Sequence, residues 1–511
     1  MSAAKTRSRS CRLLAALAAL GAVLAHLASR RLPRLAVALA FAIGSLDAAA
    51  VHLGPRGLGQ VLLFPYYTAR STATGTYNTL FTITNTAADT KVVRVRFRES
   101  RNGREVAGAN VFLVPFDSWT GAVIPDSAGP VFVTRDASCT EPNLGHDPGR
   151  LRFANAQYAG VNADGEDPSL DRAREGYVEA YEMGVVADAT LLAALAPYRG
   201  YDRPGVANCN AARAVPLDNV TAIVAPSGGL TGSASIINVA DGTLYSYDAT
   251  AIDDFSRVPL WTPPGDLARP SLGDVNPRTS RVLDGAAIRE SGWDVTKGAS
   301  PADPVSAILM QDHLINTYVL DLDTQSATDW IVTMPTKPFY VVAGAAGTAS
   351  AVPPFASTFA QGGAPDYFGL APTTLAYSDF DSGDTQLYDR DGGFPVGMFD
   401  WGPNPPPALI ELRWTANVLT FNNTNLFASV AGADVGAMLP DGWLRLAPYP
   451  HHDAAIHKLV STDTPAATYY GLPMIGFMAN SYVNGTLAGG TGPVLSSYGA
   501  TSPHKGHVRV E

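Results

Sequence analysis

Three groups of side chains in this sequence have types and spacing that could do chemistry, and the first is the acidic segment DFDSGDTQLYDRD at residues 379–391. Asp379, Asp381 and Asp384 cluster around a glycine, and Ca²⁺ takes about six to eight oxygen ligands in flexible loops. The spacing departs from the EF-hand pattern, because the twelfth residue from Asp379 is Arg390, where that loop needs a glutamate. The segment predicts either a weak calcium site or a solvated turn, and the sequence indicates no other cofactor.

Histidines form the second group. His451, His452 and His457 place three imidazoles within one short segment, and neutral imidazole can bind Zn²⁺ or Cu²⁺. They follow a Pro-Tyr-Pro sequence, so a polar surface loop explains them as well. His504 and His507, near the C-terminus, are interpreted as surface residues of a frayed tail.

The third group contains the candidate catalytic residues. Glu175 and Glu179 could form the carboxylate pair of a glycosidase, although a solvated strand face explains them equally well. Ser227 lies in the sequence Pro226-Ser227-Gly228-Gly229. It precedes a strand, so it is interpreted as a turn residue. The sequence contains no G-x-S-x-G, H-E-x-x-H or G-x-x-x-x-G-K-[ST] motif. It therefore predicts no catalytic residue and no cofactor-binding residue.

Only two cysteines, Cys139 and Cys209, follow the first fifty residues. Two cysteines in an oxidising compartment usually pair, and both lie in polar, turn-rich sequence. A bridge that closes a loop of about 70 residues would stabilise the fold by on the order of 4 kcal/mol in the chain-entropy model. We predict a disulfide between them, with two separate buried thiols as the alternative.

These side chains must be positioned by a β-rich scaffold, because 48 glycines and 38 prolines interrupt the chain often and long helical periodicity is absent. KVVRVRFR at 91–98 alternates strictly, which predicts a half-buried antiparallel strand with a charged face. An Asp-Gly pair at 241–242 predicts a hairpin turn. Residues 187–196 are the best helix candidate, and 258–298 is interpreted as loop with a short helix near its end. The fold class predicted is mainly β: immunoglobulin-like antiparallel β-sandwich domains with a few short helices and long loops.

Four regions are expected along the chain, because about 460 residues exceed what one core usually serves. They are a leader at 1–50, an N-terminal β-sandwich at 51–136, a mixed β-rich middle region with short helices at 137–300, and a C-terminal β-rich domain at 301–511.

The leader has the parts of a secretory signal peptide, in duplicate. Basic residues precede an apolar stretch at 13–28, and a second basic cluster precedes another at 35–46, which ends in small residues up to Ala50. Either translation starts further downstream or the leader is one long segment with a hydrophobic hairpin. Neither stretch reaches the roughly 18–20 residues that span a bilayer. Cleavage after Ala50 and export are expected, to the periplasm, the cell surface or the medium.

Charge limits the partners of the exported part. The first fifty residues hold seven of the 36 Lys and Arg and one of the 46 Asp and Glu, which leaves 29 positive and 45 negative side chains and a net charge near −16. This balance argues against binding nucleic acid or anionic lipid through a basic surface. No integral membrane body is expected.

Four segments resemble a group of uncharacterised exported proteobacterial proteins. They are GQVLLFPYY at 59–67, GGLTGSASIINVADGTLYSYDATAI at 228–252, DWIVTMPTKPFYV at 329–341 and YGLPMIGFMANSYVNG at 470–485. Their order matches as well, so the resemblance covers most of the chain after the leader. It implies an exported location and a shared architecture. The family has no assigned activity, cofactor or catalytic residue, so it implies no site.

The function that the sequence favours is a binding or structural role in the cell envelope or at the cell surface, rather than catalysis. Candidate partners are an envelope component, an extracellular polymer or another protein. The alternative is a secreted hydrolase that acts on extracellular polymers through Asp and Glu side chains.

Overall fold

The computed structural model describes residues 50–145, 148–196, 199–200, 203–204, 207–215, 222–343, 349–355, 373–374, 386–392, 409–410, 412–435, 440–447, 457–489 and 492–511. Residues Ala50–Glu511 form one compact unit. Three sequence predictions lie outside the described residues. They are the leader except Ala50, the calcium aspartates Asp379, Asp381 and Asp384, and the histidines His451 and His452.

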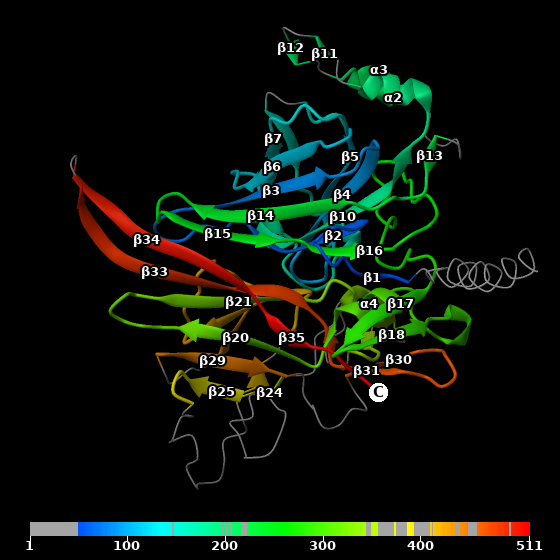
Figure 1. The fold of residues 1–511 in the computed structure, drawn as a ribbon. Coiled ribbons are helices and arrows are strands. Elements are labelled where there is room, and N and C mark those ends of the chain that lie inside the picture. The colour runs from blue at the N-terminus through cyan, green and yellow to red at the C-terminus, as the bar shows by residue number, and fades with distance from the viewer. Residues whose placement is uncertain are drawn as a thin grey trace, which may run out of the picture. The chain divides into compact units, whose positions relative to one another are not determined.

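Two antiparallel sheets pack face to face as a β-sandwich (Figure 1). Across the first sheet the strands are β1 (His52–Leu53), β16 (Thr250–Asp253), β2 (Val61–Thr68), β10 (Glu175–Val186), β4 (Lys91–Glu99), β5 (Glu105–Leu113) and β8 (Thr140–Glu141), with β13 (Ile223–Val224) also paired to β10. Across the second they are β15 (Thr243–Asp248), β14 (Leu230–Asn238), β3 (Tyr77–Asn85), β6 (Ser118–Ile124), β7 (Val131–Thr134) and β9 (Gly149–Arg152).

Alternation of apolar and polar residues explains how the two sheets face each other. In β3, Tyr77, Phe81 and Ile83 point between the sheets and are at most 4% exposed, as a period of two requires. The Phe81 ring meets Phe64 and Phe97 of the first sheet, with centroids 5.4 and 5.9 Å apart. Such aromatic contacts supply a large share of the buried area in a core.

Strands from two predicted regions share both sheets. β10 comes from the expected middle region, and it lies between β2 and β4 from the expected N-terminal region. In the same way β14 pairs with β3 along its whole length. Residues 51–136 and much of 137–300 therefore build one core together.

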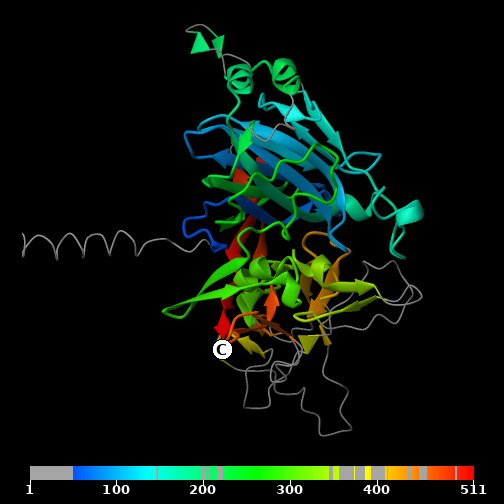
Figure 2. The same ribbon diagram turned by 90° about the vertical axis from the view of Figure 1, so that its right-hand side faces the viewer.

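A five-stranded sheet from the C-terminal part extends this core. Phe477 stacks on Tyr247 of the sandwich with centroids 4.4 Å apart, and the Thr333 hydroxyl donates a 2.6 Å hydrogen bond to the Pro65 carbonyl. The long hairpin drawn in red in Figures 1 and 2 runs beside β15. The strands are β28 (Gly432–Val435), β27 (Ala416–Phe421), β21 (Ala327–Thr333), β33 (Ile475–Gly489) and β34 (Gly492–Pro503).

Smaller sheets complete the fold, and a second apolar core contains residues of several of them. One contains β25 (Gln386–Asp389), β29 (Asp441–Leu446), β20 (His313–Val319) and β35 (Lys505–His507), and another contains β30 (Lys458–Val460), β31 (Thr468–Tyr470) and β36 (Arg509–Val510). The two-stranded pairs are β17 (Thr279–Asp284) with β18 (Ala287–Gly292), β19 (Met310–Gln311) with β32 (Leu472–Pro473), β11 (Arg199–Gly200) with β12 (Arg203–Pro204), β22 (Val341–Ala343) with β23 (Ala349–Ala351), and β24 (Thr373–Thr374) with β26 (Leu409–Ile410).

Helices are short in the described part of the chain. They are α2 (Ala189–Leu195), α3 (Cys209–Arg213) and α4 (Asp303–Leu309), with 3-10 turns η1 (Gly160–Asn162), η2 (Arg172–Arg174), η3 (Val295–Lys297) and η4 (Lys337–Tyr340). The Asp188 side chain caps α2 by accepting a hydrogen bond from the Leu191 N–H, which satisfies one of the unpaired donors at the helix start. Among the described residues, no helix is long and apolar enough to cross a membrane.

The mainly β, antiparallel fold class is confirmed, while its immunoglobulin-like topology stays a prediction. The hairpin at 241–242 is confirmed, because β14 and β15 pair from Asn238 and Thr243 outward. The predicted helix at 187–196 is found as α2. The prediction of loop for 258–298 is wrong in part, because this stretch contains the β17–β18 hairpin. The tail with His504 and His507 is also no frayed end, because β35 and β36 pair with other strands.

Candidate functional site

Strand β10 carries three carboxylates into the interior of the fold. Their side chains are at most 2% exposed, and burying an unpaired carboxylate is costly. Each therefore lies beside a cation: Glu175 beside Arg70 at 3.0 Å, Glu179 beside Arg98 at 2.6 Å and Glu182 beside Lys91 at 2.8 Å.

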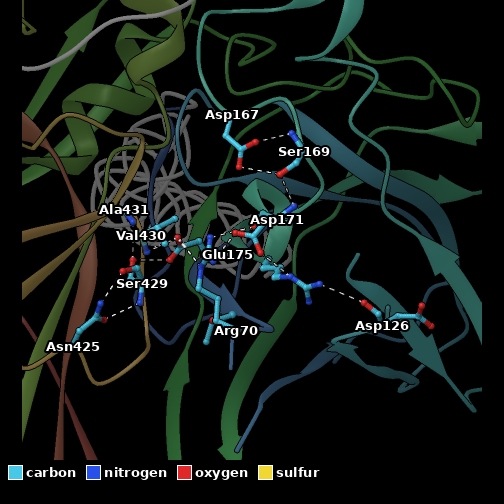
Figure 3. A network of polar contacts seen from close by, with 12 residues as sticks. Arg70, Asp126, Asp167, Ser169, Asp171, Glu175, Asn425, Ser429, Val430 and Ala431 are labelled. Carbon is cyan, nitrogen blue, oxygen red and sulfur yellow. Dashed lines mark hydrogen bonds and ion pairs between the residues drawn. The ribbon is translucent and has the colours of Figure 1, made fainter. Parts of the chain in front are cut away.

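Glu175 lies at the centre of the network in Figure 3. Its carboxylate accepts hydrogen bonds from the Tyr66 hydroxyl at 2.9 Å, the Ser429 hydroxyl at 2.6 Å and the Val430 N–H at 3.0 Å. Arg70 is shared with Asp171, whose side chain is 53% exposed. One buried carboxylate thus joins β2, β10 and a segment about 250 residues further along the chain.

That segment, residues 422–431, is the crossover between β27 and β28, which are parallel neighbours. A parallel pair cannot be joined by a tight turn, so the connection must run back along the sheet. Here it passes over the sandwich and inserts Phe427, which is fully buried. Its ring contacts the rings of Tyr66, Tyr77 and Tyr245, with centroids 5.7, 5.6 and 5.2 Å away.

Asp329 on β21 anchors the same crossover. The side chain is fully buried, and its Oδ2 accepts a 3.1 Å hydrogen bond from the Phe427 N–H. Within the described part of the chain, Oδ1 has no hydrogen-bond partner. Burial raises the pKa of Asp329 to about 8, although the backbone hydrogen bonds from Phe427 and Leu426 act in the opposite direction. The folded protein therefore holds this carboxyl in its protonated form near neutral pH.

Asp329→Asn is expected to flatten the pH dependence of stability. An unfolded aspartate has a pKa near 3.9, so between this value and about 8 the folded state binds one more proton than the unfolded state. Stability then falls with rising pH by about 1.4 kcal/mol per pH unit. From pH 5.5 to 7.5 the wild-type chain should lose about 3 kcal/mol more than the variant, as measured by urea unfolding. Equal slopes for the wild type and Asp329→Asn would contradict the prediction.

The charged face of β4, which the alternation predicts to face solvent, is buried. Arg94 and Arg96 are at most 1% exposed, because backbone carbonyls of segment 266–270 cover them and accept hydrogen bonds from the guanidinium groups. Glu105 compensates both charges, at 2.8 and 2.6 Å. The prediction that one face of this strand lies in solvent is therefore wrong. A guanidinium group has five N–H donors, and it can be buried when a loop supplies acceptors for them.

A second buried cluster is centred on Arg172. Its guanidinium is fully buried and contacts Glu99 at 2.7 Å and Asp164 at 2.6 Å, and it lies over the Tyr158 ring. Burial alone would raise the pKa of Asp164, but the hydrogen bonds and charge of Arg172 outweigh it and hold the pKa below its usual value. The cluster holds η2 and the preceding loop against β4.

Ser227 contacts a buried lysine that sequence reasoning missed, because Lys91 is 136 positions away. A serine next to a neutral amine can act as a nucleophile. Here the ammonium of Lys91 also pairs with Asp89 at 3.1 Å and Glu182 at 2.8 Å. Glu182 in turn accepts hydrogen bonds from the N–H groups of Ser227 and Gly228. The two carboxylates compensate the ammonium charge, so this contact is explained as an anchor for the turn before β14.

Glu175 and Glu179, which the sequence left as a possible glycosidase pair or a solvated strand face, are enclosed by protein. Glu179 accepts hydrogen bonds from Arg98 and from the Tyr181 hydroxyl at 2.6 and 3.0 Å. Neither carboxylate faces an open cleft, which the attack of water on a sugar between two carboxyl groups requires. In this structure their contacts are those of residues that hold strands together.

An open cleft of about 530 Å³ lies beside η3. It is polar and carries both signs of charge, and Lys297 donates a hydrogen bond to the Thr462 carbonyl across it, at 3.3 Å. Asp463 accepts a 2.7 Å hydrogen bond from the Gly292 N–H. The charged residues of its lining are Arg278, Asp294, Lys297 and Asp463.

Within the described residues, one group of three metal-ligating side chains brings its ligand atoms within 4.8 Å of one another: Asp312, His313 and His507. Asp312 Oδ1 lies 2.7 Å from His313 Nδ1 and 3.0 Å from His507 Nδ1. The sequence indicated a different histidine group, of which His457 is buried and contacts the Pro354 carbonyl at 2.8 Å. The pairing of β20 with β35 brings these residues together. No local sequence pattern near either strand predicts that pairing.

The predicted disulfide is confirmed. Cys139 and Cys209 are bonded with their Cα atoms 5.2 Å apart, which fits normal bridge geometry. The bond ties α3 to the segment before β8, and a cleft of about 270 Å³ lies around it. The calcium aspartates, Asp379, Asp381 and Asp384, lie outside the described residues, so that site stays a prediction.

Comparison with known proteins identifies no relative of this chain. No family model, no curated protein and no solved structure matches this chain. The expectations that rest on the family resemblance therefore stay predictions.

Proposed function

We propose that this chain is an exported, non-enzymatic protein with a binding or structural role in the cell envelope or at the cell surface. The observation that carries the proposal is the use of the three β10 carboxylates, Glu175, Glu179 and Glu182, in internal ion pairs between distant segments. A disulfide that fits an oxidising compartment supports export.

The cleft beside η3 supports a binding role over a purely structural one. Its mixed charges suit a polar ligand or the surface of a polymer or protein, because both donors and acceptors line it. A hydrolase that works through Asp and Glu, the alternative, would need two carboxyl groups with different environments facing one cleft. Glu175 and Glu179 do not offer this arrangement.

Two measurements test the proposal. Fractionation of the source cells, with sequencing of the mature N-terminus, should place the protein outside the cytoplasm with a start near Val51. Purified protein should then co-sediment with insoluble envelope polymers and release no soluble fragments from them. A cytoplasmic chain would contradict export. Release of fragments that is abolished by Glu179→Gln would contradict the non-enzymatic role and support the hydrolase.

A further inference from the structure

The backbone brings Asp312, His313 and His507 to one place. His313 begins β20 and His507 ends β35, and the two are direct partners across the antiparallel pair. Directly opposed residues project on the same side of a sheet with their Cβ atoms about 4.5–5.5 Å apart. The rings are accordingly stacked, with centroids 5.3 Å apart and planes inclined by 13°.

Asp312 would normally point to the other face, since neighbours in a strand alternate. It lies instead in a bend just before β20, where its N–H donates a 2.9 Å hydrogen bond to the His507 carbonyl. This bend turns the carboxylate toward the two imidazoles. The Asp312 side chain is only 6% exposed and that of His313 13%, whereas that of His507 is 56% exposed. The cluster is thus closed on one side and open to solvent on the other.

The distances suit a shared cation. Zn²⁺ binds imidazole nitrogen and carboxylate oxygen at about 2.0–2.2 Å, so two of its ligand atoms lie roughly 2.9–3.4 Å apart at angles between 90° and tetrahedral. The oxygen–nitrogen distances of 2.7 and 3.0 Å are near this range. Because the two ring planes are nearly parallel, both imidazoles would have to turn about their χ2 bonds before their lone pairs converge on one ion.

The contacts of His313 Nδ1 conflict with one another. Its Nδ1 lies 3.2 Å from Arg445 Nη2 as well as 2.7 Å from Asp312 Oδ1. A guanidinium can only donate, and a carboxylate can only accept. The two neighbours therefore require opposite roles of one nitrogen. A metal ion between His313 and Asp312 would remove the conflict with Asp312, and the Arg445 guanidinium would then have to turn away, because it carries the same sign of charge.

We propose that Asp312, His313 and His507 bind a divalent transition-metal ion, best Zn²⁺, with the remaining coordination positions occupied by water on the exposed side of His507. Two imidazoles and one carboxylate are a ligand set that zinc accepts. Three protein ligands with open positions also allow a further group, from a polar ligand or a partner, to complete the coordination.

Calorimetric titration of Zn²⁺ into the full chain, after treatment with a chelator, tests the proposal. We expect one tight site in the wild-type protein and at least a roughly tenfold weaker affinity in His507→Ala. His507 is exposed, so this variant should fold, and a circular dichroism melt checks it. The matched control is His452→Ala, which removes a histidine of the other group and should bind Zn²⁺ like the wild type.

Co²⁺ provides a second readout, since a site of this kind gives visible absorption bands that should be lost in His507→Ala. Absence of a tight site in the wild-type chain would overturn the proposal. Equal affinity in the wild type and in folded His507→Ala would do so as well. Weaker binding in His452→Ala but not in His507→Ala would assign the metal to the other histidine group and equally overturn it.

Discussion

Replacing Glu175 with glutamine is expected to lower the free energy of unfolding by about 3–5 kcal/mol, the usual cost of breaking a buried ion pair from one side. Arg70 is 6% exposed and, among the residues that the structure describes, would keep only Asp171 as a counter-charge. Ser429 and Val430 would also lose a charged acceptor at 2.6 and 3.0 Å. Glutamine keeps the size of the side chain, so the loss comes from charge and hydrogen bonding and not from a cavity.

The matched control uses the other carboxylate on the same arginine. Asp171 contacts Arg70 at 3.0 Å, but its side chain is 53% exposed. Asp171→Asn should therefore cost no more than about 1 kcal/mol, because exposed ion pairs contribute little. Denaturant unfolding of both variants measures the difference. If the two variants lose the same free energy of unfolding, burial does not explain the strength of the contact between Glu175 and Arg70, and the prediction is wrong.

The second large effect is expected for Phe427→Ala, with a loss of about 3–5 kcal/mol, as for other buried phenylalanines. The fully buried ring fills the space between Tyr66, Tyr77 and Tyr245. Its removal would leave a cavity where the crossover meets the sandwich. The surrounding tyrosines belong to paired strands and cannot move in to fill it, so most of the cost should remain.

Phe116→Ala is the control for Phe427→Ala, because the Phe116 side chain is 70% exposed. Its unfolding free energy should stay within about 0.5 kcal/mol of the wild-type value. The double variant of Glu175→Gln with Phe427→Ala gives a sharper test, since both changes loosen the crossover at 422–431. Its loss should be smaller than the sum of the two single losses. A fully additive result would show that Glu175 and Phe427 do not hold the crossover as one unit.

Local patterns predicted much of the secondary structure. The alternating segment 91–98 forms strand β4, and the Asp-Gly pair at 241–242 forms a hairpin turn. The Ala- and Leu-rich stretch at 187–196 contains helix α2. Each of these predictions rests on a pattern within a few neighbouring residues, which a single sequence displays. The β17–β18 hairpin was missed because Leu283 and Ile288, two of its apolar residues, are exposed at 65% and 67%, so that only Val282 of β17 reaches the core and no regular pattern marks the strands.

The candidate sites depended on pairing between distant segments. Asp312 and His507 are 195 positions apart, and Glu175 and Ser429 are 254 apart. Single-sequence patterns carry no information on which strand pairs with which, because alternation looks the same for every partner. For this reason the sequence grouped His451 and His452 with His457, which are neighbours along the chain, and interpreted His507 as part of a frayed tail.

The sequence by itself determined the mainly β fold class and the acidic balance of the chain, because these follow from composition and local periodicity, and it predicted the disulfide that the structure then confirmed. Only the tertiary structure decided which charges are buried. Arg94 and Arg96 have the alternating spacing of solvent-facing residues, and Glu175 was interpreted as part of a solvated strand face, yet a loop and a crossover cover them and supply partners. The physical reason is that the cost of burying a charge depends on the groups that surround it in space. Those groups come from parts of the chain that no local pattern connects.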